Sequence, residues 1–483
     1  MTGRYKPTWS SLATHPTPQW FKDEKFGIYT HWGLYSVAAY GSNGTWYPNQ
    51  IYREGSKAFN HHVKTYGHPS EFGHKDFIPM FKAEKFDADE WAEIFKSSGA
   101  RFAGPVAEHH DGFSMWDSKV NSWNAAQMGP KRDIVGELEK SIRKQGMRYV
   151  ATFHHAFNWW FFPVWDEQYD CGKQENTGFY VRTHERDERP DKEYLDQWRD
   201  KVIEVIDAYS PDLLWFDFGL GGIQERYRKE MLARYYNSAE ELGKEVVVTF
   251  KEIPKGWNHL PPGTGIADLE LGKMNELTHY QWITDTSIDA GGTWSHVTNV
   301  GFKSTERLIH NLIDRVSKNG QLLLNIGPRA DGSIPGPAQA ALVGIGRWLE
   351  VNGEAIFGTT PWVSSGTGPT AVEGGSHFNE GNEVRFTASD FRFTTKDDAV
   401  YAICLGRPGD SVNIETLRPY KSGERTKLDP FKIIYPEDIK SIRMLGSDQN
   451  LKWRLDEDGL TMEMPQKIPN DIACAFKIDL YPV

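Results

Sequence analysis

Cysteine is scarce in this chain of 483 residues. Its three cysteines, Cys171, Cys404 and Cys474, are far apart and have no metal-binding or redox spacing. They allow one disulfide at most, which excludes a small disulfide-stabilised fold. No apolar run is long enough to span a membrane, and the first residues lack the pattern of a signal peptide. We therefore expect no membrane partner and a protein that is either cytoplasmic or secreted with its signal removed.

The chain also has fewer basic residues than acidic ones, 55 Lys and Arg against 66 Asp and Glu. The net charge is −11 and no long basic run occurs, which argues against a nucleic-acid partner. The glycine-rich fingerprint of dinucleotide-binding folds does not follow the first predicted strand. Aromatic residues, in contrast, make up 13% of the chain, with 18 Trp. Because indole faces stack on the apolar faces of sugar rings, this excess is compatible with carbohydrate binding, although an aromatic core explains part of it.

Short apolar strands alternate with amphipathic helices from about residue 20 to 360. The strands are predicted at 26–31, 102–108, 147–153, 212–218, 246–250, 265–271 and 321–326. The helices are predicted at 86–98, 133–144, 193–209, 224–241, 305–318 and 337–351. This alternation predicts a parallel sheet with helical crossovers. Polar groups follow many different strands, which favours a (β/α)8-like, TIM-type barrel over residues 1–360 rather than an open doubly wound sheet.

The pattern changes after about residue 361. Short strands separated by turn residues are predicted at 383–387, 399–405, 411–415, 439–444, 460–464 and 473–480. They indicate a C-terminal antiparallel β-sandwich over residues 361–483. The stretch 364–381 is rich in Gly, Ser and Thr and is predicted to be a linker or an exposed loop. The sequence does not decide whether the sandwich binds glycan or only supports the barrel.

Asp217 stands out in the barrel region. It follows the apolar run 213–216, which reads as a buried strand, and Gly219 ends the element. The carboxyl end of such a strand is where barrel enzymes place their catalytic groups. The alternative is a carboxylate that caps the following turn.

Other polar residues follow the predicted strands in the same way. They are His31, His109, His110, His154, His155, Glu252 and Glu270. Metal-assisted hydrolysis is one hypothesis, with ligands drawn from His109, His110, Asp111, His154 and His155. Adjacent histidines on a strand point to opposite faces, which argues against it. The other hypothesis is glycoside hydrolysis, which requires two carboxyl groups, while histidines would bind sugar hydroxyls.

Several motifs of the chain are similar to those of one family. They are FGIYTHWG at 26–33, EHHDGF at 108–113, WDS at 116–118, PKRDIV at 130–135, LWFD at 214–217, VSKNG at 316–320, LLLNIGP at 322–328 and NGEAIFG at 352–358. In this order and density they resemble the α-L-fucosidases of glycoside hydrolase family 29. The resemblance implies a barrel with a C-terminal β-sandwich and exo-acting, retaining hydrolysis of terminal α-L-fucose in oligosaccharides or glycoconjugates. It also implies no metal or organic cofactor.

The resemblance assigns roles to individual residues. Asp217 matches the nucleophile that forms the glycosyl-enzyme intermediate. Four residues match sugar-contacting positions, namely His31, Trp46, His109 and His110. We add His154, at a strand end, and Trp282, in a segment where the family carries a Trp-Glu pair, to the expected sugar-binding set.

The general acid/base is the point at which this chain departs from the family. Ile283 occupies the place of the usual glutamate in 282–288 and cannot transfer a proton. We therefore expect Glu270, at a strand end, to take the role. The alternatives are Asp285, in the predicted loop 282–288, and Glu252, after the preceding strand.

Two further departures alter the predicted sugar pocket. Thr45 replaces a frequent glutamate beside Trp46, and residues 153–155 replace a Tyr-rich strand end. Two other functions therefore stay open, a glycosidase for a related sugar such as an α-L-galactoside and a catalytically weak fucose-binding protein. Neither the oligomeric state nor the linkage preference follows from the sequence.

Overall fold

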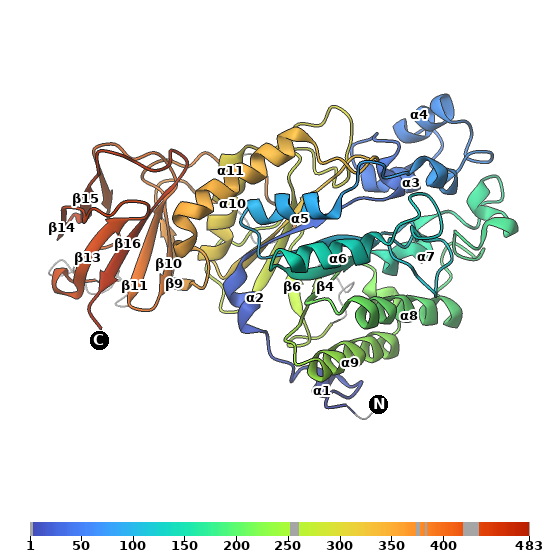
Figure 1. Ribbon diagram of the computed structural model, residues 1–483, viewed down its shortest axis with the longest axis horizontal. Coiled ribbons are helices and arrows are strands. Elements are labelled where there is room, and N and C mark those ends of the chain that lie inside the picture. The colour runs from blue at the N-terminus through green and yellow to red at the C-terminus, as the bar shows by residue number, and fades with distance from the viewer. Residues whose placement is uncertain (1–2, 252–259, 373–376, 382–383, 419–433, 483) are drawn as a thin grey trace.

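The computed structural model describes residues 3–251, 260–372, 377–381, 384–418 and 434–482. A barrel surrounded by helices lies beside a body of antiparallel sheets, with α10 (Thr305–Ser317) and α11 (Gly336–Asn352) between them (Figure 1). None of the helices in the described part of the chain combines the length and apolarity needed to cross a membrane. The three cysteines are buried free thiols.

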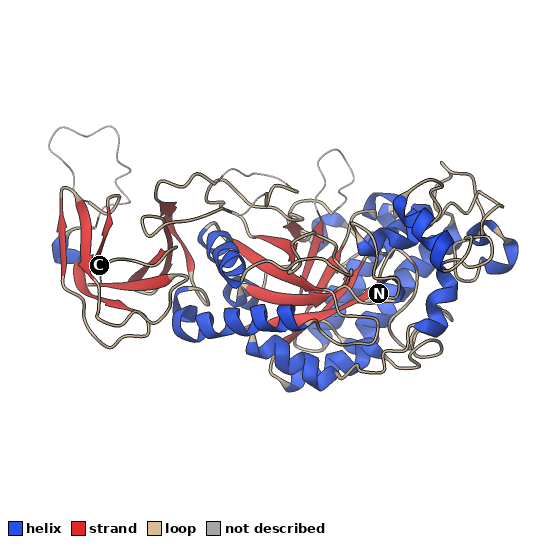
Figure 2. Cartoon of the chain, turned by 90° about the horizontal axis from the view of Figure 1, so that it is seen from above, coloured by secondary structure: helices blue, strands red, loops and turns tan. Residues whose placement is uncertain are grey.

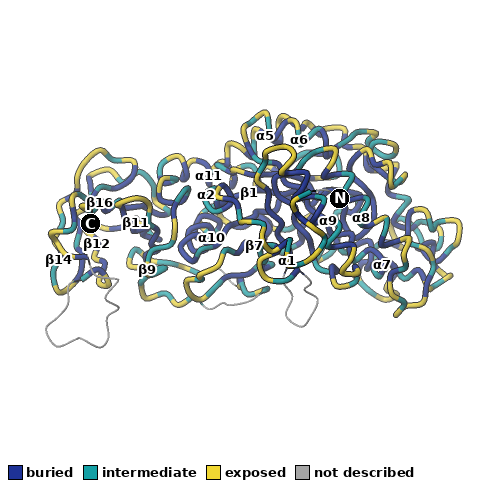
Figure 3. The backbone as a smooth tube through the Cα atoms, turned by 90° about the horizontal axis from the view of Figure 1, so that it is seen from below, coloured by how far each residue is buried: buried dark blue, intermediate teal, exposed yellow. Residues whose placement is uncertain are grey.

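Eight parallel strands close into the predicted barrel. They run in chain order, and the last pairs with the first: β1 (Phe26–Thr30), β2 (Phe102–Glu108), β3 (Arg148–Phe153), β4 (Leu213–Phe216), β5 (Val247–Lys251), β6 (Ile266–Asp268), β7 (Trp282–Ser287) and β8 (Gly320–Ile326). Strands of a parallel barrel are covered on both faces, so they read as apolar runs without alternation. The strands form a buried centre inside a more exposed ring (Figures 2 and 3).

Helices cross from strand to strand on the outside of the barrel. Together with α10 and α11, these are α5 (Ala88–Ser97), α6 (Ile134–Lys144), α8 (Lys192–Tyr209) and α9 (Glu225–Glu241). Shorter helices are α1 (Trp9–Leu12), α2 (Gln19–Glu24), α3 (Tyr47–Gln50), α4 (Lys57–Thr65) and α7 (Asn158–Phe161). Side chains of Asp87, Asp133, Asp191 and Ser304 cap the first turns of α5, α6, α8 and α10. Between β5 and β7, the described residues contain no helix.

Two antiparallel sheets form the C-terminal region, in agreement with the predicted β-sandwich. One has the order β13 (Ile439–Met444), β16 (Cys474–Leu480), β11 (Ala399–Cys404), β10 (Phe391–Lys396) and β9 (Thr360–Thr367). The other has the order β12 (Ser411–Ile414), β15 (Gly459–Glu463) and β14 (Trp453–Asp456). Apolar residues from both, such as Phe393 and Met462, share one core. Arg392 on β10 pairs with Asp314 on α10 at 2.9 Å, which ties this region to the barrel.

Three local predictions are wrong. Residues 282–288 were expected to form a loop, but β7 occupies most of them, because their threonines suit the interior of a barrel. Residues 364–381 are not simply a linker, since β9 extends to Thr367 as an edge strand and residues 377–381 contact the barrel. Residues 384–387 form no strand, and Glu383 lies outside the described residues.

Candidate active site

Side chains from seven barrel strands meet at the carboxyl end of the barrel. Every strand from β1 to β7 either contains one of them or is followed by one within a few residues, so the barrel itself sets their positions. The pocket is lined by His31, Asn43, Thr45, Trp46, His109, His110, His154, Asp217, Phe218, Lys251, Glu270, Asp285 and Trp294. The pocket thus contains every residue predicted to bind sugar or to act in catalysis, apart from Trp282 and from Glu252, which lies outside the described residues.

Asp217 lies directly after β4 and is almost completely buried. Its Oδ1 is 2.8 Å from Nζ of Lys251, and its Oδ2 is 3.3 Å from Nε2 of His110. The backbone N–H of Phe218 also donates to Oδ1. Burial alone would raise the pKa of Asp217, but the Lys251 charge and the His110 hydrogen bond outweigh it and hold the pKa below its usual range. Asp217 is therefore a carboxylate at any working pH, as a nucleophile must be.

Glu270 lies two residues beyond β6 and is the more accessible carboxyl group. Its side chain is 13% exposed, and its Oε2 is 2.9 Å from Nζ of Lys251. Burial, together with the nearby charges of Asp285 and Asp217, raises the pKa of Glu270 to about 7 against the opposing effect of Lys251. Near neutral pH this group can give up and regain a proton, which suits a general acid/base.

Asp285 belongs to the interior of the barrel rather than to a loop. It lies in the middle of β7, is fully buried, and accepts a hydrogen bond from Tyr29 Oη at 2.9 Å. Its neighbour Asp268 is equally buried, and burial followed by the Asp285 charge raises the pKa of Asp268 strongly. Asp285 is 3.8 Å from Nζ of Lys251. It lines the pocket, but its complete burial and its bond to Tyr29 make its position poor for protonating a leaving group.

Lys251, the last residue of β5, connects the carboxyl groups. One ammonium lies within 2.9 Å of both Asp217 and Glu270 and stands near the rings of Trp215 and Trp294. Burial alone would lower the pKa of Lys251, but the surrounding carboxylates raise it well above the usual value. Lys251 therefore stays charged, stabilises ionised Asp217 and draws the two carboxyl groups close together.

Four histidines line the wall of the pocket beside Asp217. His110 donates from Nδ1 to the backbone oxygen of His154 at 2.6 Å, which turns its Nε2 toward Asp217. His31 contacts Asn325 at 2.8 Å and His154 at 3.1 Å. Burial lowers the pKa of His31 to about 3 and those of His109 and His154 well below their usual value. Neutral rings of this kind can donate to and accept from sugar hydroxyls.

Within the described residues, the group that could hold a metal ion differs from the predicted ligand set. Ring nitrogens of His31, His109 and His154 lie within 4.8 Å of one another. Asp111 instead contacts His74 at 2.9 Å, and His155 points outward to the Trp198 backbone. The ligand set drawn from 109–111 and 154–155 is therefore not assembled. His154 and His155 follow β3 and enter a 3-10 turn, so the alternation of a strand does not set their directions, and the adjacent His109 and His110 both line the pocket, contrary to the expectation for histidines on a strand.

Trp282 was expected to contact the sugar, and the structure contradicts this. It begins β7, at the opposite end of the barrel, where it is fully buried and donates to the Lys318 backbone oxygen at 3.1 Å. Its ring packs against Gly320, the first residue of β8. The third acid/base candidate, Glu252, lies outside the described residues.

Several pocket residues were not predicted from the sequence. Lys251 stands directly before Glu252, and only the carboxylate was considered. A charged residue at the end of a β-branched strand was the signal that could have identified it. Trp294 and Asn43 come from loops, where no periodicity indicates which side chain turns toward the pocket.

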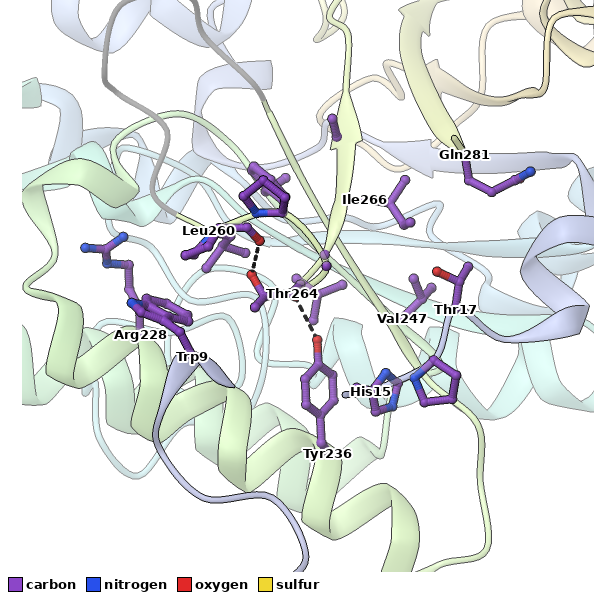
Figure 4. A pocket seen from close by; sticks show the side chains of 18 of the residues that line it. Trp9, His15, Thr17, Arg228, Tyr236, Val247, Leu260, Thr264, Ile266 and Gln281 are labelled. Carbon is purple, nitrogen blue, oxygen red and sulfur yellow. Dashed lines mark hydrogen bonds between the residues drawn. The ribbon is translucent and has the colours of Figure 1, made fainter. Parts of the chain in front are cut away.

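A larger cavity of about 940 Å³ lies elsewhere, on the outer face of β5 and β6 beside α9 (Figure 4). Tyr236 Oη donates to the Thr264 backbone oxygen at 3.0 Å across it, and His15 stacks on Tyr236. Glu225 is the only carboxylate among its lining residues in the described chain. The chemistry described above therefore belongs to the smaller pocket at the barrel mouth.

The fold and the pocket together define a class of enzyme. A (β/α)8 barrel whose mouth holds one carboxyl group with a lowered pKa, one with a raised pKa and a wall of histidines is the arrangement of a glycoside hydrolase.

Comparisons with known proteins identify the family. The family profile "Alpha-L-fucosidase" matches residues 1–354, and "Alpha-L-fucosidase C-terminal domain" matches residues 383–479. The chain is 33% identical to the tissue alpha-L-fucosidase of Rattus norvegicus over 96% of this chain and 89% of that protein. It is 32% identical to the human tissue enzyme over 98% and 90%. The solved structure of the Thermotoga maritima alpha-fucosidase in complex with fucose superimposes with a TM-score of 0.76 at 30% identity, covering 98% of this chain and 100% of that one.

The chain belongs to the alpha-L-fucosidase family and is a glycoside hydrolase of that family. The resemblance of its motifs to this family is thereby confirmed.

Proposed function

We propose that this protein is an exo-acting, retaining α-L-fucosidase that releases terminal α-L-fucose from oligosaccharides or glycoconjugates. Asp217 is the nucleophile and Glu270 the general acid/base. The observation that carries the proposal is the geometry of these two carboxyl groups. The Lys251 ammonium contacts both, while the pKa of Asp217 is lowered and that of Glu270 is raised. The Thermotoga maritima relative, whose structure contains fucose, supports the choice of sugar.

The spacing of the pair favours retention. Because both oxygens lie within 2.9 Å of the same Nζ, they are at most about 5.8 Å apart, which agrees with the separation typical of retaining enzymes. An inverting enzyme needs more room, because a water molecule must fit between the base and the sugar.

The residues then divide the reaction into two steps. In the first, Asp217 forms a bond to the anomeric carbon while protonated Glu270 transfers its proton to the glycosidic oxygen, and the leaving group departs as an alcohol. In the second, the Glu270 carboxylate takes a proton from water as that water attacks the same carbon and releases Asp217. Two inversions at one carbon restore the α configuration.

The histidine wall and Trp46 would hold the fucose. Trp46 lies 5.7 Å from the His110 ring and is partly exposed in the pocket, so it can cover an apolar face of the sugar. His31, His109 and His154 are neutral and surround the space beside Asp217. The pocket ends in the buried interior of the barrel, which suits one terminal residue rather than a continuous chain.

Retention is tested by the configuration of the first product. With an aryl α-L-fucoside, we expect α-L-fucose to appear before its β anomer, as followed by proton NMR during early turnover. A matched aryl α-L-galactoside compares the related sugar, and a chelator added to a parallel sample tests the metal hypothesis. Initial release of β-L-fucose would contradict the proposal, and so would loss of activity to the chelator.

The pH dependence should report the proton on Glu270. Its pKa is raised to about 7 and the proton is required for the first step, so kcat/KM should be high below this value and fall as the pH rises through it. Asp217 stays ionised into acid, so the acid limb should lie below pH 4 as long as the protein is folded. The measurement is kcat/KM for a phenyl α-L-fucoside from pH 4 to 10. Undiminished activity at pH 9 would contradict the assignment.

A further inference from the structure

Between β9 and β10, the chain returns from the C-terminal sheets to the mouth of the barrel. Residues 377–380 lie against the segment that carries Glu270. The backbone N–H of Phe378 donates to the Glu270 oxygen at 2.8 Å, and that of Glu380 donates to the Leu271 oxygen at 2.7 Å. In the other direction, the Glu270 N–H donates to Nδ1 of His377 at 3.0 Å. Both backbone polar groups of Glu270 are thus bound by one short segment.

Among the described residues of the barrel, β7 binds the neighbours of Glu270 and not the Glu270 backbone itself. The flanking residues Leu269 and Leu271 donate their N–H groups to Ile283 and Asp285 of β7, each at 2.9 Å. Because successive residues of an extended chain face opposite sides, the N–H and C=O of Glu270 point away from β7. β6 is only three residues long, so the strand itself gives Glu270 little restraint.

Glu380 anchors the segment. Its buried carboxylate is 2.8 Å from Nζ of Lys303 and 2.9 Å from Nδ2 of Asn311, and it also accepts from Arg307 and from the hydroxyl of Thr286. Thr286 is on β7, while Asn311 and Arg307 are on α10. The anchor therefore joins the segment to the strand beside β6 and to the helix that follows it.

The charge of this anchor is stable. Burial alone would raise the pKa of Glu380, but the charges of Lys303 and Arg315 outweigh it and lower the pKa to about 2. A buried carboxylate with this many donors is fixed in one position. Moving away from any of its partners would leave part of its charge unpaired in surroundings of low dielectric constant.

We propose that residues 377–380 are a positioning element for the general acid/base: they hold the Glu270 backbone so that its carboxyl group faces the glycosidic oxygen, with Glu380 as the anchor. This inference rests on the proposed role of Glu270. It gives the C-terminal region a part in catalysis, although residues 377–380 lie between the regions that the two family profiles match.

The test uses the dependence of the rate on the leaving group. A phenyl fucoside needs a proton from the acid, whereas a 2,4-dinitrophenyl fucoside does not. In Glu380→Gln we expect kcat/KM to fall about 10- to 100-fold for the phenyl substrate and less than about 3-fold for the dinitrophenyl substrate. His377→Ala removes the acceptor of the Glu270 N–H and should show the same pattern. If Glu380→Gln does not fold, His377→Ala tests the proposal in its place.

Arg392→Met is the matched control. It also removes a buried ion pair between the C-terminal region and α10, that of Arg392 and Asp314, but Arg392 makes none of the hydrogen bonds to Glu270. We expect Arg392→Met to change kcat/KM for the phenyl and the dinitrophenyl fucoside by the same factor. Glu270→Ala is measured in parallel. In this variant kcat/KM must fall more for the phenyl fucoside than for the dinitrophenyl fucoside.

The outcomes separate the two proposals. If Glu270→Ala shows the dependence while Glu380→Gln and His377→Ala lower both rates equally or not at all, the positioning role is wrong and the function stands. If Glu270→Ala shows no dependence, the acid/base assignment fails, and the positioning role falls with it. Leaving-group dependence in Arg392→Met as strong as in Glu380→Gln would also overturn the inference.

Discussion

Replacing Asp217 by glycine should lower kcat/KM on the order of 10⁴-fold or more for every fucoside, whatever its leaving group. The physical reason is that both chemical steps pass through the bond between Asp217 and the anomeric carbon, so neither a better leaving group nor more acid can replace it. The loss should appear mainly in kcat, measured with saturating aryl α-L-fucoside.

Added azide makes this prediction specific to the nucleophile. In Asp217→Gly, azide can occupy the space of the missing carboxylate and attack from the same face, so the product should be the inverted β-L-fucosyl azide. Asp212→Asn is the matched control, because Asp212 stands at the other end of the same strand and pairs with Arg143 at 2.8 Å, outside the pocket. The folded fraction of Asp212→Asn should hydrolyse the aryl α-L-fucoside at the wild-type rate. Activity that survives in Asp217→Gly without azide would make Asp217 a structural carboxylate.

The same variant separates an enzyme from a fucose-binding protein. If the chain only bound fucose, purified wild-type protein would release no aryl alcohol, and the Asp217 variant would not differ from it. The paired carboxyl groups and the uninterrupted β1–β8 barrel argue for turnover.

Replacing Glu270 by alanine should have the second largest effect, and one that depends on the substrate. For a phenyl α-L-fucoside or a natural disaccharide, we expect kcat/KM to fall by about 10²- to 10⁴-fold. For a 2,4-dinitrophenyl fucoside, the first step needs no proton and should remain close to the wild-type rate. The second step then limits turnover, because no base activates the water.

Azide should rescue Glu270→Ala with the opposite stereochemistry. It replaces water in the second step and attacks the fucosyl-Asp217 intermediate, so the product should be α-L-fucosyl azide. The anomer of the azide therefore distinguishes the two carboxyl groups without ambiguity. Formation of the β-azide in this variant would contradict the assignment.

Asp285→Asn keeps the shape of the side chain and serves as the comparison for Glu270. Since Asp285 is buried and bonded to Tyr29, this substitution should lower kcat/KM for the phenyl and the 2,4-dinitrophenyl fucoside to a similar extent. Rates that depend on the leaving group in Asp285→Asn but not in Glu270→Ala would move the acid/base role to Asp285.

Some parts of the fold are local enough to be read from the sequence. The helices at 134–144, 192–209 and 305–317 have capping side chains before an amphipathic pattern, and their predicted bounds agree with the structure within one or two residues. Most barrel strands were equally clear, because burial on both faces makes them continuous apolar runs. β7 was missed, since Asp285 and three hydroxyl residues give it a polar composition although every residue is buried.

The position of Asp217 followed from sequence alone, because a buried strand that ends in a carboxylate needs no distant information. The acid/base could not be settled in this way. Glu270 and Asp285 both line the pocket, and only the closed barrel shows that Glu270 is partly exposed while Asp285 is fully buried beside Asp268. Lys251 could not be predicted for the same reason, since its role exists only through the two carboxyl groups that β4 and β6 bring to it.

The sequence by itself thus determined the barrel, its family and the place of Asp217 at a strand end, because each depends on local periodicity or on motifs that stand together in the chain. The tertiary structure decided how deeply each carboxyl group is buried, which charge lies between Asp217 and Glu270, and which part of the C-terminal region contacts Glu270. These depend on contacts such as that between Glu270 and Phe378, 108 residues apart. Side-chain protonation follows burial and neighbouring charge, and both of these exist only once the chain has folded.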